Sequence, residues 1–135
     1  MDDPARTRIL VVEDEWIIAY HLEAMLMDLG YEVIGPAPTV DEAMALIKAR
    51  PPDAAVLDVS LACGRSFPVA EEMRRRGTPF VFITGYVAAD LPEAFQGHTI
   101  LNKPISLLDL KCRLAAMTMA ACSRRLTGED LRPQA

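Results

Sequence analysis

Cysteine is scarce in this sequence, and the cysteines that are present form no recognisable pairing. Three occur, at Cys63, Cys112 and Cys122, and no two of them have the C-x-x-C spacing of zinc or redox sites. An odd and widely spaced set also argues against a disulfide framework. This usage fits a reducing compartment, so we expect a cytoplasmic protein.

Long apolar runs and extended basic stripes are absent as well. No uninterrupted apolar stretch approaches the ~20 residues that span a bilayer. Residues 1–4 lack the cationic start of a signal peptide. The formal net charge is −5, and the basic clusters 74–76 and 124–125 fall where helices are expected to end. We therefore expect no membrane association and no direct contact with nucleic acid.

Short, continuous apolar runs are what the sequence does contain. Hydrophobic residues make up 51% of the chain and charged residues 24%, proportions that favour a folded globular domain. Runs that are apolar at every position are typical of strands covered on both faces. These runs predict strands at 9–12, 54–57, 80–83 and 100–102, and the short segment 31–35 predicts a further strand.

The segments between these strands have helical periodicity. Gly30 is expected to end the first helix, Thr39 and Glu42 form a capping box for the second, and Ser106 caps the last. The expected helices cover about 16–29, 40–50 (ending before Pro51), 68–76, a short turn near 91–95, and the segment after Ser106.

Strict alternation of strands and helices determines the expected fold class. It implies parallel strands joined by right-handed crossovers, and hence an α/β protein with a three-layer α/β/α sandwich and a five-stranded sheet. We expect one domain over residues 7–122, followed by a frayed tail at 123–135.

Polar side chains stand where the predicted strands end. Glu13 and Asp14 follow the first strand, Asp58 the third, Thr84 the fourth and Lys103 the fifth. Because the carboxyl ends of parallel strands meet at one edge of a sheet, where ligand sites gather, these side chains are expected to converge.

Such a cluster suits metal-assisted phosphoryl transfer to a carboxylate. Asp58 would accept the phosphoryl group. Mg²⁺ would relieve the repulsion between Asp58 and the acids Glu13 and Asp14. Lys103 would balance the developing charge, and the hydroxyl of Thr84 would bond a phosphoryl oxygen. The Lys103–Pro104 bond is a candidate for the cis form.

With these site residues in this order and with the alternation of strands and helices, residues 7–122 resemble the receiver domain of two-component response regulators. The resemblance implies a flavodoxin-like sheet of strand order 2-1-3-4-5 and phosphorylation of Asp58. It also implies that Asp14 binds Mg²⁺ directly, that Glu13 holds a metal-bound water, and that the backbone carbonyl of Ser60 is a further ligand. A receiver is a phosphoacceptor that assists its own phosphorylation and dephosphorylation, not an enzyme in the usual sense.

The string Phe82-Ile83-Thr84-Gly85-Tyr86 is similar to a variant receiver subfamily named for its Phe-Ala-Thr-Gly-hydrophobe-Tyr (FAT GUY) motif. Ala62 replaces the usual proline after the acceptor, and Ile100 stands where most receivers carry an aromatic residue. Within this subfamily Tyr86, rather than a distant aromatic, would report the phosphate, with Pro104 as a second conformational position. Partners of such receivers are often histidine kinases of the HWE type.

We therefore expect a stand-alone response regulator. It would accept a phosphoryl group from a sensor histidine kinase or a phosphotransfer protein, and would act on a downstream protein or as a phosphate sink. The sequence leaves its oligomeric state open.

Three alternatives remain. A phosphatase resembling haloacid dehalogenases would need a second aspartate at Ser60, and a nucleotide- or flavin-binding protein would not place the acids 13–15 after its first strand. A pseudo-receiver would fold alike without being phosphorylated.

Several other residues have more ordinary interpretations. Glu15 is interpreted as a solvated acid in the first helical turn. Trp16 is either a core residue or the lip of the pocket. His21 and His98 are given no ligand role, and nothing visible in the sequence activates Cys63.

Overall fold

A five-stranded parallel sheet forms the middle layer of the protein. The computed structural model describes residues 6–61, 64–85, 91–95 and 98–127, and side chains as far as Thr118. The sheet has the order β2-β1-β3-β6-β7, which confirms the expected order 2-1-3-4-5 among the five parallel strands. The strands are β1 (Arg8–Val12), β2 (Glu32–Ala37), β3 (Ala54–Asp58), β6 (Phe80–Thr84) and β7 (Ile100–Asn102).

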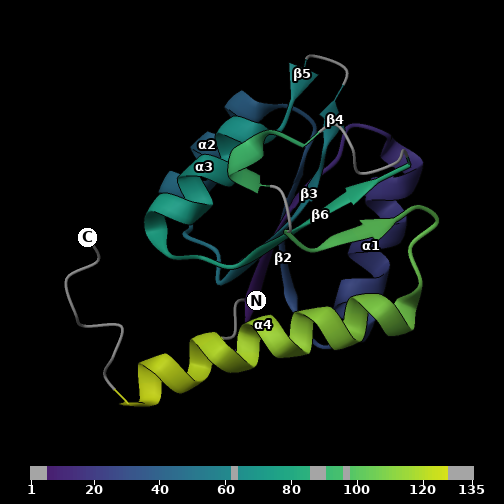
Figure 1. Ribbon diagram of the computed structural model, residues 1–135. Helices are drawn as coiled ribbons and strands as arrows, with labels where there is room; N and C mark the ends of the chain where they lie inside the picture. The colour runs from purple at the N-terminus through teal and green to yellow at the C-terminus, as the bar shows by residue number, and fades with distance from the viewer. Residues whose placement is uncertain (1–5, 62–63, 86–90, 96–97, 128–135) are drawn as a thin grey trace.

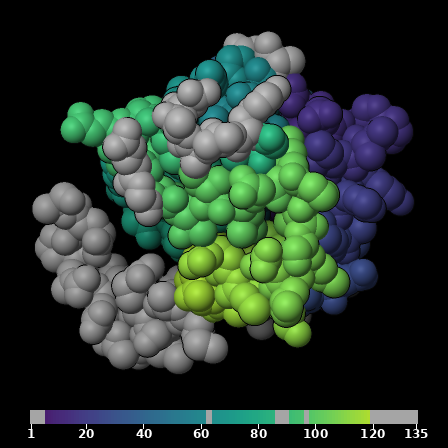
Figure 2. All heavy atoms as spheres, turned by 45° about the vertical axis from the view of Figure 1, so that its right-hand side comes forward, coloured from purple at the N-terminus to yellow at the C-terminus, as the bar shows by residue number. Residues whose placement is uncertain are grey.

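Helices cover both faces of this sheet, which confirms the three-layer α/β/α sandwich (Figure 1). One face carries α1 (Trp16–Asp28) and α4 (Leu107–Thr127), and Figure 2 shows their surfaces on the same side of the molecule, α1 in purple to blue and α4 in yellow-green. The other face carries α2 (Val40–Ala49), α3 (Phe67–Arg76) and the short 3-10 helix η2 (Glu93–Phe95).

Successive residues of each central strand enter opposite hydrophobic clusters. On β1, Leu10 and Val12 pack toward α2 and α3, whereas Ile9 and Val11 pack toward α1 and α4. All four are fully buried. This arrangement explains the continuous apolar runs, because both faces of the strands are withdrawn from water.

Two predicted helix caps are present. The Thr39 hydroxyl accepts a hydrogen bond from the Glu42 amide at 3.1 Å, and the Ser106 hydroxyl accepts one from the Asp109 amide at 3.2 Å. The last helix, α4, continues to Thr127, into the segment that we expected to be a frayed tail. No proline or glycine interrupts the chain from Ile105 to Thr127, so nothing stops the helix earlier.

The second strand is longer than expected. It continues through Pro36 to Ala37 instead of ending at Gly35. Gly35 has φ +98°, and the register against β1 shifts between Leu10 and Val12. Pro36 is tolerated because β2 is an edge strand and the chain bulges there, so no ladder hydrogen bond needs its missing N–H.

The segment after Asp58 also differs from the expected loop. It forms a two-stranded antiparallel hairpin of β4 (Ser60–Leu61) and β5 (Gly64–Arg65), in which Ser60 pairs with Arg65. Such short pairs depend on the contacts of the folded chain, and the sequence carries no strong hairpin signal here. The first strand of this pair begins two residues after Asp58.

Candidate functional site

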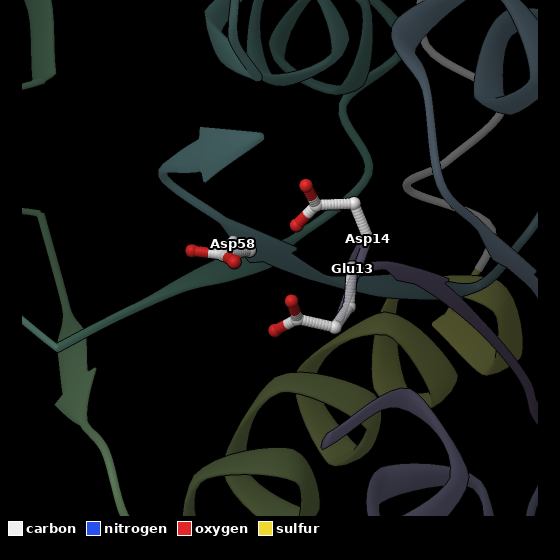
Figure 3. Close-up of side chains that lie close together, drawn as sticks. All are labelled: Glu13, Asp14 and Asp58. Carbon is white, nitrogen blue, oxygen red and sulfur yellow. The ribbon is translucent and has the colours of Figure 1, made fainter. Parts of the chain in front are cut away.

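Three carboxylates meet at the carboxyl edge of the sheet. Glu13 and Asp14 follow β1, and Asp58 is the last residue of the neighbouring strand β3 (Figure 3). One carboxylate oxygen from each lies within 4.8 Å of the others. The predicted convergence of these acids is therefore present, and it follows from the pairing of β1 with β3.

Glu13 is held by the backbone on both sides. Its amide donates to the Ala37 carbonyl oxygen at 3.0 Å, and its Oε2 accepts from the Glu15 amide at 3.0 Å. Burial raises the pKa of Glu13 to about 7, and the neighbouring carboxylate of Asp58 adds to this rise. The Glu15 amide and Lys103 oppose it without cancelling it. The folded protein therefore holds an acid that resists ionisation unless more positive charge is supplied.

Lys103 brings a positive charge to this cluster of acids. Its Nζ lies 3.1 Å from Asp58 Oδ2 and 3.1 Å from Glu13 Oε1. Burial of the ammonium lowers the pKa of Lys103, but the hydrogen bonds to Asp58 and Glu13 outweigh this and raise it above the usual value. The ammonium therefore stays charged and contacts the carboxylate of Asp58.

The remaining predicted acceptor-site residues lie at the same edge. Asp58 is 3% exposed, and its Oδ1 accepts a hydrogen bond from the Ser60 amide at 3.3 Å. Thr84 ends β6 and is buried, and its carbonyl oxygen accepts from the Lys103 amide at 2.9 Å. The Lys103–Pro104 bond is cis. Tyr86 lies outside the described residues, as does Cys63.

Sequence reasoning missed one contact of this cluster. Glu15, interpreted as a solvated acid, has its Oε1 3.5 Å from Lys103 Nζ, although its side chain is 65% exposed. The position of Glu15 directly after Glu13 and Asp14 in the sequence could have indicated this contact. Trp16 is 76% exposed and so is not a core residue. His98 stacks on Phe80 and bonds to its carbonyl oxygen, away from the acids.

The donor set fits a hard divalent cation. The three converging groups offer only carboxylate oxygens, which are the ligands that Mg²⁺ prefers, and this ion typically keeps water in its other positions. A cation there would also relieve the unfavourable ionisation of Glu13. The acid cluster is thus a candidate site for Mg²⁺.

Comparison with known proteins assigns the chain to a family. The profile of the response regulator receiver domain matches residues 9–115. The chain therefore belongs to the response regulator receiver domain family.

Two curated relatives are much longer than the matched region. The chain is 34% identical over 107 residues to the transcriptional regulatory protein PdtaR of Mycobacterium tuberculosis, covering 76% of this chain and 52% of PdtaR. It is 38% identical over 92 residues to the phyllosphere-induced regulator PhyR of Methylorubrum extorquens, covering 66% of this chain and 33% of PhyR.

Solved structures agree with this assignment. The solution structure of SdrG from Sphingomonas melonis Fr1 matches with a TM-score of 0.73 and 40% identity, covering 87% of this chain and 98% of SdrG. The response regulator PhyR from Brucella abortus matches with a TM-score of 0.78 and 28% identity, covering 95% of this chain and 54% of PhyR. Among the described residues, no helix has both the length and the apolar character of a membrane span.

Proposed function

We propose that this receiver accepts a phosphoryl group on Asp58 in a two-component phosphorelay in the cytoplasm. One observation carries the proposal: the ammonium of Lys103 lies 3.1 Å from the Asp58 carboxylate, beside the acids that could hold a divalent cation. An acceptor carboxylate needs both a cation to keep it ionised and a positive group to receive the incoming phosphate.

The transfer is a single displacement at phosphorus. An oxygen of Asp58 attacks the phosphorus of a phosphohistidine on the donor protein, an O–P bond forms and the N–P bond breaks. The electron pair of the broken bond goes to the imidazole nitrogen, which takes up a proton from solvent. Lys103 and the Thr84 hydroxyl bond the transferred oxygens, and the Ser60 amide orients the attacking carboxylate. Mg²⁺, held by Asp14, Asp58 and the Ser60 carbonyl, and by Glu13 through water, would neutralise charge on the phosphoryl oxygens.

The proposed donor is a sensor histidine kinase or a phosphotransfer protein. Trp16, Ile17 and Tyr20 on the first turns of α1 are 76%, 61% and 67% exposed. They directly follow the acid cluster in the chain, so a partner that seats on them would reach Asp58. This apolar surface supports a protein donor over small molecules alone.

We propose that the phosphorylated receiver signals by contact with a downstream protein. Alternatively, it acts as a phosphate sink that drains the kinase. SdrG, to which this chain is 39% identical, has been solved in a BeF3-activated conformation. Membership of the FAT GUY subfamily, the roles of Tyr86 and Pro104 as switch positions, and an HWE-type kinase belong to the same proposal. They rest on the string 82–86 in the sequence.

The acceptor role is tested by intact mass after incubation with acetyl phosphate and Mg²⁺. We expect a gain of one phosphoryl group that disappears in Asp58→Asn and is lost on treatment with hydroxylamine. Asp41→Asn removes an exposed acid on α2 and is the matched control, which should be phosphorylated as the parent is. Equal phosphorylation of Asp58→Asn, or none in the parent with any donor, would overturn the proposal, and the second result would favour a pseudo-receiver.

A further inference from the structure

An open pocket lies at the end of the sheet opposite to the acid cluster. Its volume is about 560 Å³, within the range of small-ligand sites. Its lining residues come from the start of β6, the segment just before β7, the end of α3 and the middle of α4. Figure 1 shows α3 and α4 on opposite faces of the sheet. Its lining includes Thr78, Phe80, Thr99 and Met117.

The charged side chains of this pocket have one sign. Arg74 from α3 and Arg113 from α4 line it, and none of the described lining residues is acidic. The whole chain, by contrast, has a net charge of −5. Two guanidinium groups from separate helices match the charge of a dianion such as a phosphate monoester.

The side chain of Arg74 is held in place by contacts within the protein. Arg74 donates from Nη2 to the Ala94 carbonyl oxygen at 2.6 Å, and its guanidinium lies 4.5 Å from the centroid of the Phe95 ring. A guanidinium has five N–H donors, so this one bond leaves others for a ligand. Arg113 makes no ion pair or hydrogen bond with another residue in the described part of the chain.

The apolar part of the lining is also fixed. The rings of Phe80 and His98 stack with centroids 4.2 Å apart, and the His98 Nε2–H donates to the Phe80 carbonyl oxygen at 2.8 Å. With Met117, these rings give the pocket an apolar side beside its two cations. A rigid surface of this kind lowers the cost of ordering on binding.

We propose that this pocket binds a small organic phosphate, with the phosphate between Arg74 and Arg113 and the apolar part of the ligand against Phe80 and Met117. The site is separate from phosphoryl transfer, because the length of β6, roughly 13 Å for four residue steps, lies between the pocket and Thr84.

The test is a titration of the metal-free protein with phenyl phosphate, followed by two-dimensional ¹⁵N–¹H NMR. Without a divalent cation, the acid cluster repels the probe. We expect saturable shifts of the amides of Thr78, Phe80 and Thr99, with half-saturation at about 1 mM. Inorganic phosphate should bind several-fold more weakly, because it has no apolar part to bury.

Two variants with the same loss of charge make the test specific. Arg113→Gln removes one cation of the pocket at an exposed position and should raise the half-saturation concentration about tenfold. Arg75→Gln, an exposed residue on α3 outside the pocket, should leave it within about twofold of the parent. Asp58→Asn should bind phenyl phosphate as the parent does, so failure of the acceptor role would leave this result intact. Shifts that do not saturate, equal effects of the two arginine variants, or an equal response to inorganic phosphate would overturn the proposal.

Discussion

At the carboxyl end of the parallel sheet several charged side chains are buried in one cluster, whereas at the amino end they form a separate pair (Arg50 with Glu32), bond to the backbone or remain at the surface. The carboxyl end holds Glu13, Asp58 and Lys103, all largely withdrawn from water. At the amino end, Asp53 accepts a hydrogen bond from the Arg8 amide at 2.8 Å, and the guanidinium groups of the pocket belong to exposed residues.

The two ends differ in how much buried charge they hold. A buried group of charges costs stability unless each charge has a partner, and here the acids exceed the described cations. The contacts at the amino end resemble ordinary caps and strand ends, which stabilise the fold. The carboxyl end should therefore respond strongly to changes of charge and of metal, and the amino end weakly.

The largest effect is expected from removal of Lys103. Lys103→Met keeps the volume but leaves Asp58 and Glu13 without their ammonium, which should lower the unfolding free energy of the metal-free protein by about 2–3 kcal/mol at pH 7.5. Urea denaturation measures this loss, and Mg²⁺ should restore more stability to the variant than to the parent. Arg76→Met at the surface is the control, with a loss below about 1 kcal/mol. A variant as stable as the parent would show that the buried charges are not coupled.

The next effect is a pH dependence that comes from Glu13. Its pKa is raised to about 7 in the folded protein from an ordinary value of 4.5. Between these values the folded state holds a proton that the unfolded state has lost, so this group stabilises the fold fully below about pH 4.5 and ceases to do so as pH rises through 7. In metal-free protein the part of this decline that falls between pH 5 and pH 7.5 is of the order of 2 kcal/mol.

Glu13→Gln should abolish this part of the pH dependence, as chemical denaturation at pH 5 and pH 7.5 would reveal. Mg²⁺ should stabilise the parent more at the higher pH, because it binds the ionised acids. Identical pH profiles of parent and variant would contradict the assignment of the shift to Glu13.

Substitution of two glycines with positive φ, Gly35 near the carboxyl end of the sheet and Gly77 near its amino end, allows a direct comparison of the two ends. At Gly35, a Cβ would lie 2.7 Å from the Ala37 nitrogen and 2.9 Å from the Val11 oxygen, whereas at Gly77, with φ +71°, no atom lies within 4 Å. Gly35→Ala should cost about 2 kcal/mol and Gly77→Ala about 1 kcal/mol.

A second measurement distinguishes the two positions further. Ala37 accepts the hydrogen bond from the Glu13 amide, so Gly35→Ala should also weaken Mg²⁺ binding, followed by Trp16 fluorescence. Gly77→Ala should leave that affinity unchanged. Equal losses of stability and affinity in both variants would mean that the bulge does not position the acid.

The smallest effect is expected on the surface of α3. Hydrogen bonds from Arg75 and Arg76 lower the pKa of Glu72 to about 2. Because the folded value lies below 4.5, this stabilisation is present above pH 4.5 and is lost as pH falls toward 2. Glu72→Gln should cost about 0.5 kcal/mol at pH 7 and nothing at pH 2, measured by urea denaturation. A loss that persists at pH 2 would point to packing instead.

Much of the site could be predicted because it depends on which residue follows each strand. Asp58 and Lys103 stand directly after or at the end of apolar runs, so parallel pairing alone brings them to one edge. The caps at Thr39 and Ser106 were predictable for a similar reason, since they satisfy amides only three residues away.

Other features depend on contacts between residues that are distant in the chain. The continuation of β2 through Pro36 requires an edge position, which only the assembled sheet provides. The contact of Glu15 with Lys103 requires the end of β7 to lie near the start of α1. The hairpin after Asp58 likewise forms against elements that the local residues do not specify.

The sequence by itself determined the alternation of strands and helices, the burial of the strands on both faces and the order in which acids, hydroxyl and lysine reach one edge. These properties depend on local periodicity and on the constant direction of parallel strands. Only the tertiary structure decided how close the charges approach, how far burial raises the pKa of Glu13, and that two arginines from opposite faces line one pocket. Such properties depend on distance and on exclusion of water, which exist only once the layers have packed.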